Sequence, residues 1–205
     1  KVFNDKHGIT IFGSGHLSMY MGAGAVKSRM LVPADFAGKK VRSMGPAENA
    51  LLGALGANPT TMAFGDVPPA LQTGVIDGLL TSLGGFNQVK EQAPYFTVAG
   101  INGIVGDYYW IGASNKWWAT LDKKQKAALT DIIMNDFIPY QKAINFCNDK
   151  RLVDKFKVTD KSAPGIYVMS PAEAGVLQAK EGGATNNWIK SKVDDMGDKM
   201  VDQFT

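Results

Sequence analysis

Apolar side chains recur every three or four positions through the second half of the chain, which is the spacing of one helix face. One such series predicts a long helix over residues 122–156. Its apolar members include Leu129, Ile132, Ile133, Phe137 and Ile144. Asp122 followed by Gln125 is typical of a helix start, and Pro139 inside the series predicts a kink.

Shorter segments alternate between strand-like and helix-like patterns. Apolar runs beside glycines or turns predict strands over residues 8–12, 40–44, 75–81 and 165–169, and a mostly extended segment over 95–113. Helices are predicted over residues 33–36, 46–55, 66–74, 87–92, 171–181 and 185–204. Residues 13–24, rich in glycine, serine and methionine, are expected to form a loop. The alternation predicts an α/β fold with mixed or parallel sheets.

The composition is that of an ordinary globular protein. The chain has 205 residues, of which 45% are hydrophobic and 20% charged, so a sizeable core can form. The formal charge is +3 and the lysines and arginines are scattered, which argues against nucleic-acid binding. No run of about 18 apolar residues occurs, so a transmembrane helix is not predicted. The single cysteine, Cys147, excludes an intramolecular disulfide.

Residue patterns that would indicate an enzyme are absent. His7 and His16 have no cysteine or acidic residue at the spacing of metal ligands, so structural or surface roles are favoured for both. Gly13-Ser14-Gly15 follows a strand but lacks the lysine of a P-loop and the third glycine of a dinucleotide fingerprint. We therefore expect no catalytic residue, no metal site and no cofactor.

Arg42 is the strongest candidate for binding. It ends a predicted strand, and Phe64 follows in a proline-rich turn. A guanidinium matches a carboxylate bidentately, and an aromatic ring supplies an apolar wall. The pair therefore suits the binding of a small organic anion. The alternative for Arg42 is an ordinary exposed position at the end of a strand.

A second candidate is the aromatic cluster Tyr108, Tyr109 and Trp110. Alternation along a strand places Tyr108 and Trp110 on one face and Tyr109 on the other. Aromatic walls are typical of small-molecule sites, but core packing explains the same residues equally well.

Several ordered motifs resemble one family. They are GKKVR at residues 38–42, GANPTTMAF at 56–64, LQTGVIDG at 71–78, SNKWWATLDKKQ at 114–125 and IYVMSPAE at 166–173. In this order they resemble the solute-binding proteins of TRAP transporters, of the dicarboxylate-receptor type. The resemblance covers nearly the whole chain.

The resemblance implies a periplasmic receptor with two α/β lobes, mixed sheets and a long kinked helix. Such a receptor hands a small organic acid to a membrane permease. It implies that Arg42 grips the ligand carboxylate and that Phe64 and Thr81 line the cleft. The full set of expected ligand-binding residues is Arg42, Phe64, Thr81, Phe86, Tyr108, Tyr109 and Trp110.

Two departures from the family pattern bear on the ligand. Leu79-Leu80-Thr81 stands where the family commonly has Gln-Glu-Asn, so one wall is expected to be less polar. A second upstream arginine has no clear match. Both departures favour a monocarboxylate with an apolar or aromatic body over a dicarboxylate.

A third departure is length, because receptors of this family are usually longer at the amino end. We expect residues 20–107 and 148–205 to form the second lobe, and residues 1–19 and 108–147 to belong to an incomplete first lobe. Exposed apolar surface is expected there, covered by dimerisation or by a separate chain. The competing interpretations are a sensory or interaction module that reuses the same fold, and an α/β enzyme acting on a small acid.

Overall fold

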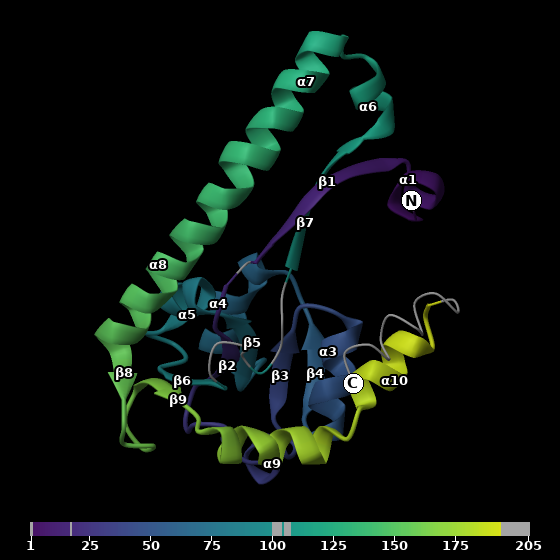
Figure 1. Cartoon of the computed structure of the whole chain (residues 1–205). Helices are drawn as coiled ribbons and strands as arrows, with labels where there is room; N and C mark the ends of the chain where they lie inside the picture. Colours follow the sequence, from purple (N-terminus) through teal and green to yellow (C-terminus); the bar gives the residue numbers. More distant parts are fainter. Residues whose placement is uncertain (1, 17, 100–103, 105–107, 194–205) are drawn as a thin grey trace.

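The computed structural model describes residues 2–16, 18–99, 104 and 108–193. Its body contains a seven-stranded mixed sheet (Figure 1). Across the sheet the strands are β4 (Asn58–Thr61), β3 (Lys40–Ser43), β5 (Gly78–Ser82), β2 (Met21–Ala25), β6 (Tyr95–Val98), β9 (Gly165–Val168) and β8 (Lys157–Val158). Strand β2 runs antiparallel to both neighbours, and the other pairs are parallel. The predicted α/β class with a mixed sheet is confirmed.

Helices pack on both faces of this sheet. One face carries α2 (Pro33–Phe36), α3 (Pro46–Ala54) and α9 (Pro171–Glu181), whose apolar residues share a core cluster with Val41 and Leu80. The other face carries α4 (Val67–Gln72) and α5 (Leu83–Val89), which pack on Leu79 and on Phe96. Leu79 and Leu80 are neighbours in β5 and serve opposite faces, as strand alternation requires.

The remaining short elements of the body join these layers. A 3₁₀ turn, η1 (Phe64–Asp66), leads into α4, and α10 (Ala184–Lys190) contacts α3. The expected strand over residues 40–44 and the helices over 33–36, 46–55 and 171–181 are confirmed within one or two residues. Strand β4 was not expected, because Asn58-Pro59-Thr60-Thr61 has no apolar alternation and Pro59 cannot donate to a ladder.

The loop expected over residues 13–24 is wrong. Strand β1 (Ile9–His16) extends through its first part, and β2 begins at Met21 in the centre of the large sheet. All five residues of β2 are buried. A Cβ on Gly24 would lie 2.7 Å from Leu79 Cδ2, and one on Gly22 would overlap the Thr97 carbonyl oxygen. Glycine is therefore required where the neighbouring strands crowd β2, and does not indicate a turn here.

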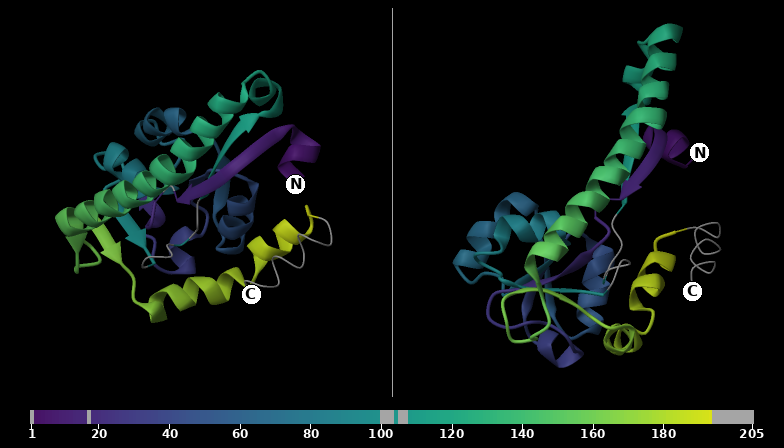
Figure 2. Two further views of the ribbon diagram at one scale, coloured as in Figure 1. Left: turned by 45° about the horizontal axis from the view of Figure 1, so that its top comes forward. Right: turned by 60° about the vertical axis from the view of Figure 1, so that its left-hand side comes forward.

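An arm projects from the body (Figures 1 and 2). We define the arm as residues 2–16 and 108–147. It contains α1 (Val2–His7), an antiparallel pair formed by β1 and β7 (Tyr108–Ser114), α6 (Asn115–Ala119) and the first part of a long helix. The helix lies along the strand pair and returns to the body, where its last part packs on α5.

The long helix is continuous from Lys123 to Phe156 and consists of α7 (Lys123–Asp131), the π-helical segment η2 (Ile132–Phe137) and α8 (Ile138–Phe156). Asp122 and Gln125 form the predicted capping box, with backbone bonds of 2.9 and 3.0 Å. The π-helical turns directly precede Pro139. Because proline lacks an N–H and its ring clashes with the carbonyl of the residue four positions earlier, a widened turn accommodates it.

The two sheets use different parts of the chain. The seven-stranded sheet draws on residues 21–98 and 157–168, and the two-stranded pair on residues 9–16 and 108–114. The assignment of these parts to two ligand-binding lobes stays a prediction. In the described ranges, no helix has both the length and the hydropathy that a bilayer crossing needs.

Candidate functional site

Arg42 is buried in β3, with only 5% of its surface exposed. Its strand neighbour Val41 packs in the core on the α3 face, so alternation turns Arg42 to the opposite face. There Nε donates to the Met62 carbonyl at 3.1 Å, and Nη1 donates to the Leu80 carbonyl at 3.0 Å. These two bonds fix the plane of the guanidinium. The alternative of an exposed strand-end arginine is wrong.

Phe64 and Thr81 lie beside Arg42. The guanidinium carbon is 5.8 Å from the centre of the Phe64 ring, a cation–π distance. Arg42 pairs with Leu79 in the sheet, and Thr81 follows two residues later on the same face. A Cβ on Gly85 would lie 3.2 Å from the Phe64 ring and would overlap Thr81 Oγ1. The absence of a side chain at Gly85 thus lets both Phe64 and Thr81 lie against the backbone of α5.

These three residues line a cavity of about 620 Å³, large enough for a small organic molecule. Most of its lining comes from β3, η1, β5, α5, β7 and α8. The lining residues are Arg42, Met44, Phe64, Thr81, Ser82, Gly84, Gly85, Gln88, Tyr109, Asn145, Asn148, Asp149 and Leu152. The body and the long helix thus both contribute to one cavity.

The contribution of α8 was missed in the sequence. Asn145, Asn148, Asp149 and Leu152 follow the i, i+3, i+4, i+7 spacing of one helix face. That spacing was available as a signal, but three polar residues on a long helix are more commonly solvated. Their presence adds a largely polar wall to the cavity, apart from the less polar wall expected at residues 79–81.

Asp149 is a buried acid in this wall, with 4% of its surface exposed. The Ser18 hydroxyl and the Met19 backbone N–H both donate to its Oδ2 at 2.6 Å. Burial raises the pKa of the Asp149 carboxyl, and the hydrogen bonds from Ser18 and Met19 oppose that shift. Asp149 therefore ties the segment between β1 and β2 to the long helix while facing the cavity.

The aromatic cluster divides between two environments. Tyr109 lines the cavity. Trp110 is 59% exposed and packs on Phe3 of the arm, with ring centres 5.5 Å apart, so it lies outside the cavity. The backbone of Tyr108 begins β7, and its side chain lies outside the described residues. Tyr109 and Trp110 thus face different surroundings, as alternation predicts.

Phe86 is a core residue and does not line the cavity. It is 2% exposed, stacks on Phe96 at 4.7 Å and meets Phe156 edge-on at 6.3 Å. The expectation that Phe86 contacts a ligand is therefore corrected. Its position on α5, one residue after Gly85, turns it toward β6 and away from Arg42.

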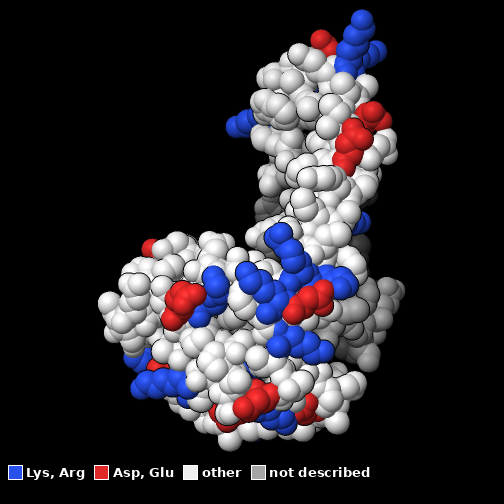
Figure 3. Space-filling model, turned by 90° about the vertical axis from the view of Figure 1, so that its left-hand side faces the viewer, with Lys and Arg blue, Asp and Glu red and all other residues white. Residues whose placement is uncertain are grey.

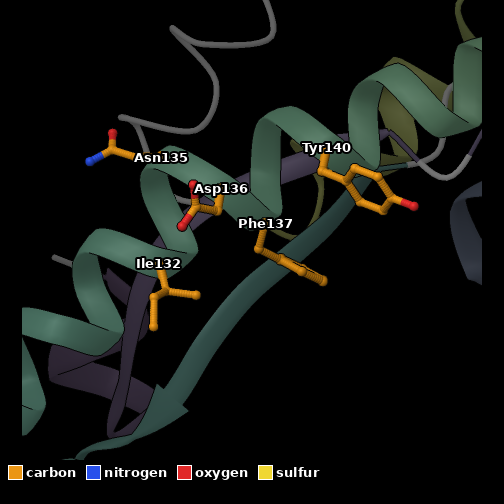
Figure 4. A pocket seen from close by; sticks show the side chains of 5 residues that line it. All are labelled: Ile132, Asn135, Asp136, Phe137 and Tyr140. Atoms are coloured by element: carbon orange, nitrogen blue, oxygen red, sulfur yellow. The ribbon is translucent and has the colours of Figure 1, made fainter.

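A second hollow, of about 500 Å³, lies on the arm and is lined by Ile132, Asn135, Asp136, Phe137 and Tyr140. Figure 4 shows Ile132, Phe137 and Tyr140 leaving the helix on one side, while Asn135 points away from them. Three of its five described lining residues are aliphatic or aromatic, and Asp136, which carries the charge among the five, is exposed. We regard the first cavity as the candidate binding site.

The described part of the chain offers no constellation for metal-dependent chemistry. Among those residues, no three His, Cys, Asp or Glu side chains gather closely enough to hold an ion. The cavity instead combines one arginine, one acid, amides, hydroxyls and two aromatic rings, which is a set suited to holding a molecule.

Residues 3–180 match the family described as bacterial extracellular solute-binding protein, family 7. The chain belongs to this family, which is one of binding proteins and not of enzymes.

Solved structures agree on the fold. The galactonate complex of the sugar acid binding protein from Advenella mimigardefordensis matches with a TM-score of 0.80 and 20% identity, over 95% of this chain and 61% of that one. A TRAP periplasmic solute-binding protein from Sulfurospirillum deleyianum with bound succinate matches with a TM-score of 0.78 and 23% identity, over 98% and 66%. The periplasmic ectoine-binding protein of a Halomonas elongata TRAP transporter matches with a TM-score of 0.76 and 20% identity, over 97% and 63%.

The fold is thus that of TRAP solute-binding proteins. The chain spans 61–66% of the length of these three proteins.

Proposed function

We propose that this chain is the ligand-binding part of a TRAP transporter receptor. It holds a small organic acid in the cavity at Arg42, works in the periplasm and delivers its ligand to a membrane permease. The observation that carries this proposal is a buried arginine, 5% exposed, in the wall of a cavity of about 620 Å³. A buried guanidinium beside an aromatic ring suits a carboxylate, which it can bind bidentately.

The structural relatives support an acidic ligand. Those with bound galactonate, succinate and (S)-2-acetolactate all carry an organic anion. The family description, an extracellular solute-binding protein, agrees with a role outside the cytoplasm.

We further propose that the ligand closes the cavity. Arg42 and Thr81 lie on strands of the body, and Tyr109 lies on β7 of the arm. A carboxylate that pairs with Arg42 while its remainder touches Tyr109 would bridge the two parts. Such a ligand favours the closed arrangement because it binds that arrangement more tightly.

The test is calorimetry, or saturation-transfer NMR at millimolar ligand, with short carboxylates added to the protein and to Arg42→Gln. We expect Arg42→Gln to weaken binding by roughly tenfold or more, because one partner of a buried charge pair is lost. Lys124→Gln is the matched control, since it removes a positive charge from an exposed position on α7, outside the cavity wall. Circular dichroism verifies that each variant is folded. Equal binding by Arg42→Gln and the unaltered chain would exclude Arg42 from the site.

A further inference from the structure

The described residues of the cavity wall include one cation and one anion. Among the thirteen lining residues, only Arg42 and Asp149 carry a formal charge at neutral pH. Both are more than nine-tenths buried, at 5% and 4% exposure. They come from different elements, Arg42 from β3 and Asp149 from α8. The described part of the wall therefore carries one positive and one negative charge, on different elements.

Within the part of the chain that the structure describes, the Asp149 carboxylate accepts hydrogen bonds from neutral groups and forms no ion pair. Ser18 and Met19 donate to one carboxylate oxygen, and no ion pair joins Asp149 to a lysine, arginine or histidine of the described ranges. A buried carboxylate is stabilised most by a cation together with hydrogen bonds. The raised pKa of the Asp149 carboxyl agrees with burial that its hydrogen bonds offset only in part.

We propose that the ligand is a zwitterion, a monocarboxylate that also carries a cationic nitrogen. Its carboxylate pairs with Arg42 and its nitrogen with Asp149. This inference rests on the proposed function and narrows its substrate class. Asn145 and Asn148 line the cavity on the same face of α8 as Asp149, so the nitrogen would lie among polar side chains.

A dicarboxylate fits this wall poorly. Its second carboxylate would have to lie near Asp149 or leave Arg42, and like charges in a buried site repel strongly. A plain monocarboxylate would pair with Arg42 but leave Asp149 without a cation. A zwitterion, in contrast, places an opposite charge beside both Arg42 and Asp149.

The test uses matched ligands on the unaltered protein. At chain lengths of three, four and five carbons, the unsubstituted acid, its terminal amino derivative, its terminal hydroxy derivative and the dicarboxylate are compared by calorimetry or saturation-transfer NMR. We expect the amino derivative of at least one length to bind roughly tenfold or more tightly than the other three. A hydroxy derivative that binds equally well would overturn the charge pairing, because a neutral donor would then suffice.

Asp149→Asn should abolish this preference. Asparagine keeps an oxygen that can accept from Ser18 and Met19, and removes a buried charge, so we expect the variant to fold. The amino and unsubstituted acids should then bind alike. A retained preference would overturn the inference.

The failure of this inference can be distinguished from the failure of the proposed function. If Arg42→Gln weakens binding of every acid but no amino derivative is preferred, the receptor function stands and the zwitterion is wrong. If Arg42→Gln changes no affinity, the proposed function itself fails.

Discussion

At the scale of single residues, the Glu173 carboxylate is contacted by donors from three different residues. Lys161 Nζ lies 2.5 Å from Oε1, the Ser170 backbone N–H and hydroxyl donate to Oε2 at 2.8 and 2.9 Å, and the Tyr167 hydroxyl donates at 3.0 Å. Together these contacts lower the pKa of the Glu173 carboxyl to about 2, with the Lys161 contact as the largest cause. The bond from the Ser170 backbone N–H also forms one half of the capping box of α9.

We predict that Glu173 makes stability depend on pH. Its pKa falls from 4.5 in the unfolded chain to about 2 in the folded one, so its contribution is complete above pH 4.5 and is lost as pH falls toward 2. Glu173→Gln should cost about 1 kcal/mol of unfolding free energy at pH 7, because glutamine can keep the capping bond to Ser170 but loses the charge that pairs with Lys161. Urea unfolding should give a smaller difference in unfolding free energy between the variant and the unaltered chain at pH 3 than at pH 7.

The matched control is Glu91→Gln, because the Glu91 side chain is 83% exposed. Its unfolding free energy should equal that of the unaltered chain at pH 7. A Glu173→Gln cost of the same size at both pH values would contradict the prediction.

Two buried arginines show what the sequence can and cannot say about a residue. Arg42 was predicted as a site residue from its strand-end position and a nearby phenylalanine, and it does line the cavity. Arg29 is as deeply buried, at 6% exposure, but its guanidinium donates to four backbone carbonyls, among them Ala163 at 2.6 Å and Lys161 at 3.1 Å. Nothing local in the sequence predicts those long-range partners. Asp149 was missed for the same reason, since its partners lie 130 residues away.

At the scale of elements, local signals determined which predictions succeeded. The start of α7 was predicted because Asp122 and Gln125 are three residues apart and satisfy each other's backbone donors. Strand β2 was missed because its glycines are required by two neighbouring strands, which are distant in sequence. The π-helical turns before Pro139 also escaped prediction, since proline only indicates a disturbance and the packing decides its form.

We predict that the cap of α7 stabilises the arm. Asp122→Ala removes the acceptor for the Gln125 backbone N–H, which leaves one donor of the first turn without its partner. The cost should be about 1 kcal/mol. Hydrogen exchange should become faster at the first amides of α7 and stay unchanged in β3. Lys124→Ala is the matched control, because Lys124 lies in the same turn without a capping role. Equal exchange in both variants would contradict the prediction.

At the scale of the whole molecule, the exposed apolar surface is concentrated in the arm. Ten of the fourteen large apolar residues that are exposed in the described ranges belong to it: Phe3, Tyr109, Trp110, Trp117, Ile132, Met134, Phe137, Tyr140, Ile144 and Phe146. Figure 3 shows lysines and arginines gathered where the arm joins the body, while uncharged surface covers much of the arm apart from acidic side chains along one edge and a few basic ones. This agrees with the expectation that residues 1–19 and 108–147 leave apolar faces uncovered.

In a solution of the purified chain alone, a second copy is the partner available to cover these faces. We therefore predict concentration-dependent self-association through the arm. Phe137 and Tyr140 are 48% and 64% exposed beside the second hollow, so Phe137→Ser with Tyr140→Ser should weaken association at least about tenfold, since burying one such ring is worth about 1.5–3 kcal/mol. Sedimentation equilibrium measures the effect.

Val32→Ser with Val75→Ser, two exposed positions on the body, is the matched control and should associate like the unaltered chain. A chain that remains monomeric at about 100 μM would refute the prediction, because uncovered apolar faces of this kind favour association at such concentrations.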